Sequence, residues 1–230
     1  MVVENTKQSK NRSVRANGLH KPSGSAVPGG KDYNVPLDPN EDNIWYVAIL
    51  EHQKYTAYCC DYIEKAFTEQ HCRCFVPFKD ELHVYPNRTK RMVRKYIIPR
   101  LVFVTGIDER QAYDFVPQWP HVDLFMPDRA RKRNGGRMAL AKIEQHELVK
   151  LQHVINGIPS AEDVTFTTDD LHFDDTIEIV RGDLKGLEGG YCCDDGKDFL
   201  VVMIGKLGNI KVRVSIADCS LKKNQQGDAQ

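Results

Sequence analysis

Cysteine and histidine are the residue types in this chain that could bind a metal or act as a nucleophile. Seven such residues fall between positions 52 and 83: His52, Cys59, Cys60, His71, Cys72, Cys74 and His83. Structural zinc sites take their ligands in two pairs, each separated by a few residues. Cys72 and Cys74 are too close together, no second pair follows, and no local motif supports a Cys–His nucleophile. We therefore expect no catalytic residue, metal or cofactor, and thiols that pack as small hydrophobic groups. Stoichiometric zinc in the purified protein would favour the alternative, an enzyme or metalloprotein.

Clustered cations offer a different chemistry, the binding of phosphates. Residues 79–100 contain seven Lys or Arg against two acidic residues, and a second basic cluster spans residues 129–137. Such clusters can neutralise phosphates and release counterions. The predicted nucleic-acid-binding residues are Arg88, Lys90, Arg91, Arg94, Lys95, Arg129, Arg131, Lys132 and Arg133. The alternative is ordinary solvated surface charge, since the whole chain balances 32 basic against 32 acidic residues.

A third feature is the bulky apolar run around Pro99, from Tyr96 to Leu101. Neighbouring residues of a strand point to opposite faces, yet this run is bulky on both. One face fills the core, and the other must be covered by a neighbouring domain or by a partner. Packing within the core alone is the competing interpretation.

Composition sets the outer limits. The chain has 230 residues, of which 41% are hydrophobic and 28% charged, so it can bury a core as one extended domain or two small ones. Its formal net charge of zero argues against a protein that coats nucleic acid in bulk. No run approaches eighteen apolar residues and the N-terminus lacks an apolar signal region, so we expect a cytoplasmic protein without a membrane contact.

The elements that must position these residues follow from periodicity. Residues 1–43 show no helix or strand period and are predicted to be a disordered basic arm. A central strand is expected at 44–50, an amphipathic helix at 53–70, and strands at 74–78, 81–85 and 92–104, the last broken or bent at Pro99. A short helix capped by Asp108, a strand at 122–126 and a helix over 141–155 complete an α+β unit, residues 44–157, with helices on an antiparallel sheet.

The remainder changes character. Residues 158–172 are predicted to be an acidic, solvated linker. Residues 173–223 alternate in hydrophobicity around glycine turns, which predicts a small, closed all-β barrel, and residues 224–230 form a tail.

In this order the motifs resemble the NusG family. Trp45–Val47 opens the first strand, Phe75–Pro77 follows the helix, and a basic hairpin leads into Ile98–Val104. Residues 173–189 resemble the KOW motif, with glycines at Gly182, Gly186 and Gly189. The resemblance spans roughly residues 44–223 and implies a NusG N-terminal α/β sandwich followed by an SH3-like KOW barrel. The basic extension and diverged motifs look more like a specialised, UpxY-like paralogue than the housekeeping factor.

The resemblance implies a transcription elongation and antitermination factor. Its N-terminal domain would bind the RNA polymerase clamp through Tyr46, Ile97, Ile98 and Leu101, and its cations would face upstream or non-template DNA. Pausing and termination would be suppressed on specific operons, such as those for surface polysaccharide synthesis. A monomer is expected, with a ribosomal protein or Rho as candidate partners of the KOW domain. The alternative is a KOW-containing protein associated with ribosomes or RNA that has no polymerase role.

Overall fold

Two antiparallel sheets flank the long helix α3 (Gln145–Gly157) in the computed structural model, which describes residues 31–132, 138–168 and 175–222. The first sheet has the strand order β2-β5-β1-β6, and β9 pairs with the opening residues of β1. Its strands are β1 (Ile44–Leu50), β2 (Arg73–Phe75), β5 (Leu101–Thr105), β6 (Val122–Phe125) and β9 (Lys142–Glu144). The mixed α+β composition agrees with the sequence-based prediction.

Strand β1 is buried on both faces, which explains why its sequence is apolar throughout. Tyr46 and Ala48 lie in a cluster with side chains of α1 (Thr56–Ala66) and α2 (Glu109–Phe115), whereas Trp45 and Val47 join the cluster that contains α3. The helices α1 and α2 therefore cover one face of the sheet, and α3 lies on the other.

Local signals set the ends of these helices. Asp108 caps α2 in a capping box with Gln111, as its sequence position predicts. Helix α3 ends at Gly157, where a stop was expected, but begins at Gln145 rather than 141 because residues 142–144 pair with β1. Short 3-10 turns occupy Gln53–Tyr55, Thr68–Gln70, Val116–Gln118, Ala161–Asp163 and Ile216–Asp218.

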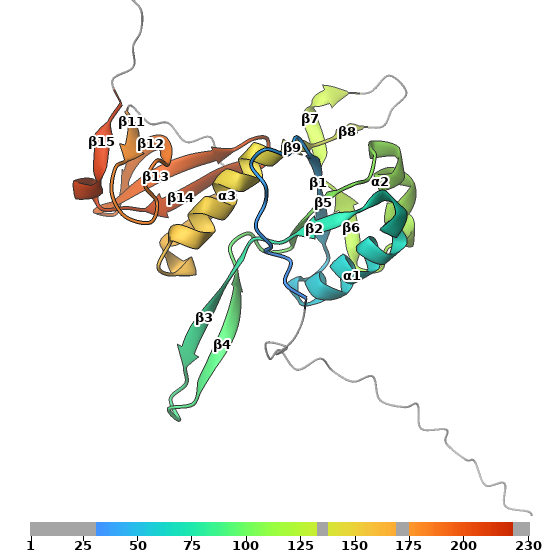
Figure 1. The fold of residues 1–230 in the computed structure, drawn as a ribbon, viewed down its shortest axis with the longest axis horizontal. Coiled ribbons are helices and arrows are strands. Elements are labelled where there is room, and N and C mark those ends of the chain that lie inside the picture. Colours follow the sequence, from blue (N-terminus) through green and yellow to red (C-terminus); the bar gives the residue numbers. More distant parts are fainter. Residues whose placement is uncertain (1–30, 133–137, 169–174, 223–230) are drawn as a thin grey trace, which may run out of the picture.

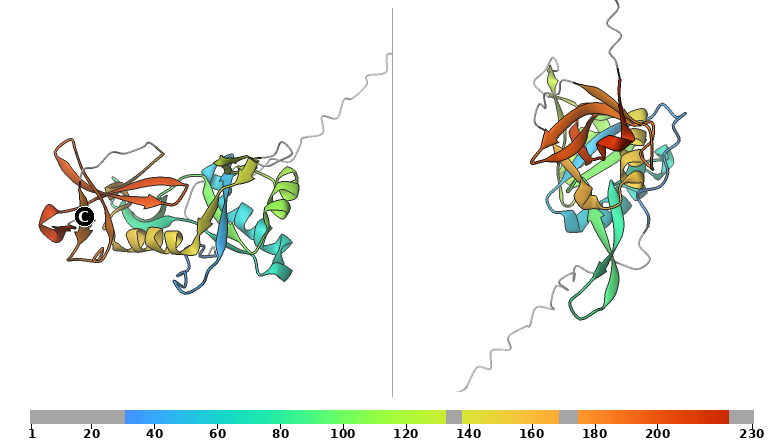
Figure 2. Two further views of the ribbon diagram at one scale, coloured as in Figure 1. Left: turned by 90° about the horizontal axis from the view of Figure 1, so that it is seen from above. Right: turned by 90° about the vertical axis from the view of Figure 1, so that its left-hand side faces the viewer.

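Two hairpins stand apart from this sheet. Strands β3 (Phe78–Val84) and β4 (Lys90–Tyr96) form a ribbon that projects away from both sheets (Figures 1 and 2). Strands β7 (Pro127–Lys132) and β8 (Met138–Leu140) form the other. Of the two alternatives for 92–104, a break at Pro99 is the one that the structure has: β4 and β5 belong to different sheets, and the chain turns between them at Arg100, where φ is +67°.

The second sheet has the order β10-β14-β13-β12-β11-β15. Its strands are β10 (Val164–Thr167), β11 (Thr176–Ile179), β12 (Glu188–Asp194), β13 (Lys197–Ile204), β14 (Gly208–Arg213) and β15 (Cys219–Leu221). Two expectations need correction here. Within the described residues, β10 and β15 end the sheet without pairing with each other, so the strand order is open. The predicted linker is partly structured, because residues 164–167 pair with β14.

The predicted arm is also partly wrong. Residues 1–30 lie outside the described part of the chain, but residues 31–43 pack on the first sheet. The Tyr33 side chain is buried and its hydroxyl donates to Asp61 of α1, while the backbone N–H of Leu37 donates to Gln152 of α3 at 2.8 Å. This segment therefore contacts helices on both sides of the sheet.

Helix α3 joins the two sheets into one apolar cluster. Its Leu148, Leu151 and Ile155 are buried in the cluster that also contains Leu200 and Ile204 of β13. Polar contacts continue the junction: the Gly205 N–H donates to Glu147 at 2.9 Å, and Lys206 pairs with the buried Asp128.

Candidate nucleic-acid interface

The base of the β3–β4 hairpin is held by the end of helix α3. Lys79 donates from Nζ to the carbonyl oxygens of Ile155, at 3.2 Å, and Ile158. Glu81 accepts hydrogen bonds from the Ser160 hydroxyl and the Ala161 N–H. The Ala161 N–H is the main reason that the pKa of Glu81 lies below its ordinary value. These bonds fix the direction in which the ribbon projects.

Arg94 and Lys95, two of the predicted nucleic-acid-binding residues, are paired at this base. The Arg94 guanidinium makes two 2.9 Å bonds to the carboxylate of Asp80 and lies 3.6 Å from the ring centre of Phe78. Lys95 lies 3.0 Å from Glu81 and 2.8 Å from Glu162. Because acidic partners offset both charges, these residues brace the hairpin and offer little to a phosphate.

The tip carries the free cations. Arg88, Lys90 and Arg91 are exposed, and within the described residues no acidic side chain pairs with any of them. The turn itself is ordered: the Tyr85 N–H donates to Thr89 at 2.9 Å, and the Arg88 N–H donates back to Tyr85 at 2.8 Å. The tip thus presents three positive charges on a preformed turn, an arrangement suited to phosphate binding.

The second basic cluster lies elsewhere. Arg129, Arg131 and Lys132 belong to β7, and Arg133 lies outside the described residues. Hairpin β7–β8 stands on the opposite side of the first sheet from β3–β4 (Figures 1 and 2). The structure therefore does not bring the two clusters together into one surface.

The four residues predicted to bind polymerase form no exposed patch in this structure. All are buried, from 1% exposed at Ile98 to 7% at Ile97 and Leu101. Tyr46 faces the α1 and α2 side of the sheet, whereas the other three lie in the cluster shared with α3 and the second sheet. In this structure Ile97, Ile98 and Leu101 are therefore covered by the chain's own core and by the second sheet, and they offer no free surface to a partner.

The three glycines of the KOW-like segment have backbone roles. Gly182 and Gly186 adopt φ values of +80° and +85°, which disfavour other residues, and the Gly186 N–H donates to Ile179 at 2.7 Å. Gly189 packs so tightly that a Cβ atom would lie 2.2 Å from the Val201 carbonyl oxygen.

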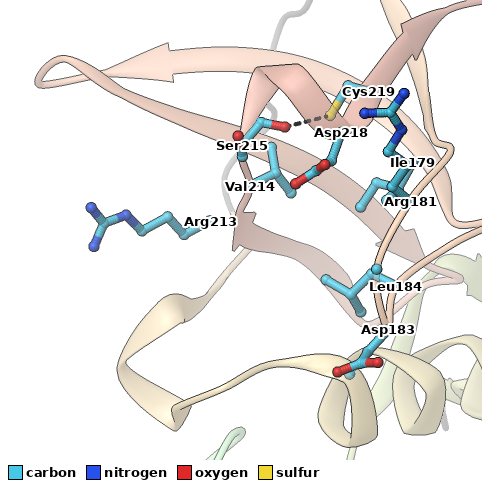
Figure 3. A pocket seen from close by; sticks show the side chains of 11 residues that line it. Ile179, Arg181, Asp183, Leu184, Arg213, Val214, Ser215, Asp218 and Cys219 are labelled. Atoms are coloured by element: carbon cyan, nitrogen blue, oxygen red, sulfur yellow. Dashed lines mark hydrogen bonds between the residues drawn. The ribbon is translucent and has the colours of Figure 1, made fainter.

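A shallow pocket of about 160 Å³ lies beside this turn. Its charged lining is mixed, with Arg181 near Asp218 and Asp183 on the far side, while Arg213 extends away from the others (Figure 3). Arg213 also lies 4.0 Å from Asp163. A lining with both charges gives this pocket no preference for an anion or a cation.

The thiols are mostly structural. Cys59, Cys60, Cys72 and Cys74 are buried, as expected, while Cys193 is exposed. Burial raises the pKa of Cys59 to about 12, so its thiol stays protonated and unreactive at neutral pH. Among the described residues, no three His, Cys, Asp or Glu side chains are placed to hold a metal ion. No helix of the described part is long and apolar enough to cross a membrane.

Sequence comparison adds no relative: no family model matches the chain, and no curated protein matches it. Comparison of structures finds a chain described as "Domain interaction in Thermotoga maritima NusG". The two chains are 19% identical, the match covers 79% of this chain and 98% of the other, and the TM-score is 0.43. At that TM-score the overall superposition of the two chains is loose.

Proposed function

We propose that this protein is a transcription elongation and antitermination factor of the NusG type that contacts DNA through the β3–β4 hairpin. The observation that carries the proposal is the division of charge along this hairpin. Arg94 and Lys95 are paired at its base, whereas Arg88, Lys90 and Arg91, at its projecting tip, have no acidic partner among the residues that the structure describes. The motif order along the chain supplies the connection to transcription. The mechanism is binding, and it requires no catalytic group.

The polymerase contact is proposed for Ile97, Ile98 and Leu101. These side chains are buried on the α3 side of the sheet, so the polymerase must compete with the chain's own apolar cluster for them. Tyr46 is left out of the contact because it faces the opposite side. The junction formed by Glu147 with Gly205 and by Asp128 with Lys206 is where the second sheet would separate.

Once bound, the protein would hold the polymerase in a state that resists pausing and termination. We propose that this acts on specific operons, such as those for surface polysaccharides, with Rho or a ribosomal protein as the partner of the second sheet.

The test is a termination assay with purified RNA polymerase, on templates carrying the leader of the protein's own operon. We expect more readthrough with the full-length chain than without it, and co-purification of polymerase with the tagged chain. A variant with Arg88, Lys90 and Arg91 replaced by Ala tests the role of the hairpin tip. It should still bind polymerase but give less readthrough than the parent. Recovery of ribosomes without polymerase, or unchanged readthrough, would contradict the proposal.

A further inference from the structure

The β3–β4 hairpin has an exposed apolar face that phosphate contacts do not explain. Leu82, Val84 and Met92 are 52–57% exposed, although all three are large hydrophobic side chains. Exposed apolar groups that gather on one element mark an interaction surface.

The strand register places these residues on the same face of the ribbon. Leu82 lies opposite Met92, and Val84 lies opposite Lys90. Residues directly across an antiparallel pair point to the same side, and so do residues two positions apart. One side of the outer ribbon therefore presents Leu82, Val84 and Met92 beside the ammonium group of Lys90.

The other face is mostly polar, since it carries His83 opposite Arg91 and, nearer the base, Glu81 opposite Val93 and Lys79 opposite Lys95. Lys79 and Glu81, which share this face, bind the last turn of α3 and the segment that follows it. Both faces meet the body of the protein at the base, since Phe78 and Tyr96 of the apolar face pack in the cluster with α1 and α2. Farther out, Leu82, Val84 and Met92 of that face stay exposed.

The charge around the apolar face indicates its partner. Residues 82–92 include three cations, Arg88, Lys90 and Arg91, and no acidic residue. A surface that combines apolar side chains with unpaired cations complements duplex DNA, which offers phosphates at the groove edges and base edges between them. The major groove is about 12 Å wide and admits a two-stranded β-ribbon, and the thymine methyl group is its apolar contact.

We propose that the β3–β4 hairpin inserts its apolar face into the major groove of duplex DNA. Leu82 and Met92 contact base edges, including thymine methyl groups, while the tip cations bind the flanking phosphates. This deepens the proposed function and rests on its assignment of the hairpin to DNA, but it adds a contact with the bases themselves.

The test measures binding of the full chain to an A·T-rich duplex by fluorescence anisotropy. A double variant, Leu82→Ser with Met92→Ser, removes the apolar contact at exposed positions, and Met203→Ser removes an equally exposed apolar group from β13. We expect the double variant to lose affinity without a change in salt dependence and the control to bind as the parent does. Replacing thymine by uracil should weaken the parent about fourfold for each methyl group contacted and leave the double variant unaffected.

In the binding assay, the inference would be overturned by equal affinity of the parent and the double variant, by no effect of uracil on the parent, or by tighter binding to the separated single strands than to the duplex. Polymerase capture by the same proteins separates the two proposals. If the parent captures polymerase but the binding assay gives one of these three results, only the groove contact is wrong. If the binding assay gives the expected losses of affinity and polymerase is not captured, only the proposed function is wrong. Loss of polymerase by the double variant would assign the apolar face to a protein and overturn the groove contact.

Discussion

Replacing Ile98 by Ala tests whether the predicted polymerase contact is covered in the free protein. Ile98 is 1% exposed and lies in the cluster that joins the first sheet, α3 and the second sheet. Truncating a fully buried Ile to Ala removes three methyl or methylene groups and leaves a cavity, which costs about 2–5 kcal/mol in the free energy of unfolding.

The assay is urea denaturation of the full chain followed by circular dichroism. The control is Ile216→Ala, the same chemical change at a side chain that is 58% exposed, for which we expect a change within about 0.5 kcal/mol. In a thermal scan the Ile98 variant should melt lower by about 2–4 °C for each kcal/mol lost.

Equal stability of the two variants would refute the reasoning, because it would mean that Ile98 is exposed in solution and that the cluster around it is open. The comparison also warns against Ile98→Glu as a probe of polymerase binding. A charge introduced at this depth destabilises the fold, so loss of binding by that variant would not identify a contact.

Three further results are expected. Because hydrogen bonding to the charged form holds the pKa of Glu81 below 4.5, its stabilising contribution is present above that pH and lost as the pH falls through the lowered value; unfolding free energies across this range should be less pH-dependent in Glu81→Gln. Gly189→Ala should destabilise the second sheet by about 1–3 kcal/mol in denaturant titrations, because its Cβ would meet a backbone oxygen, whereas Gly196→Ala meets no atom within 4 Å and should cost only the strain of its positive φ, about 1 kcal/mol. A thiol reagent should modify Cys193 in the native protein and Cys59 only after unfolding; rapid native modification of Cys59 would contradict its burial.

Local signals were enough to predict the elements whose order comes from neighbouring residues. The doubly apolar β1 was expected to be central, and Asp108 was expected to cap α2; both are confirmed. Hydrophobic periodicity predicts such elements because their burial pattern repeats along the chain.

Elements ordered by distant partners were missed. Residues 31–43 have no period, and their order comes from contacts such as that of Leu37 with Gln152. Strand β10 has only four residues and follows the acidic Glu162 and Asp163, so its short alternation of Val164 and Phe166 does not distinguish it from a linker, and its pairing with β14 identifies it as a strand. The site shows the same limit: basic residues predicted a charged hairpin, but Asp80 and Glu81 decide which of its cations remain free.

Helix α3 has a consequence for how the protein can be studied in pieces. The apolar side chains of α3 pack in one cluster with residues of both sheets, so neither sheet has a complete hydrophobic core of its own. Cleavage near residue 158 would expose apolar side chains of this cluster on each fragment, and such surfaces promote self-association. Measurements on the separate halves would therefore reflect the newly exposed apolar surface as well as the properties of each half. Experiments on stability and binding should use the intact chain.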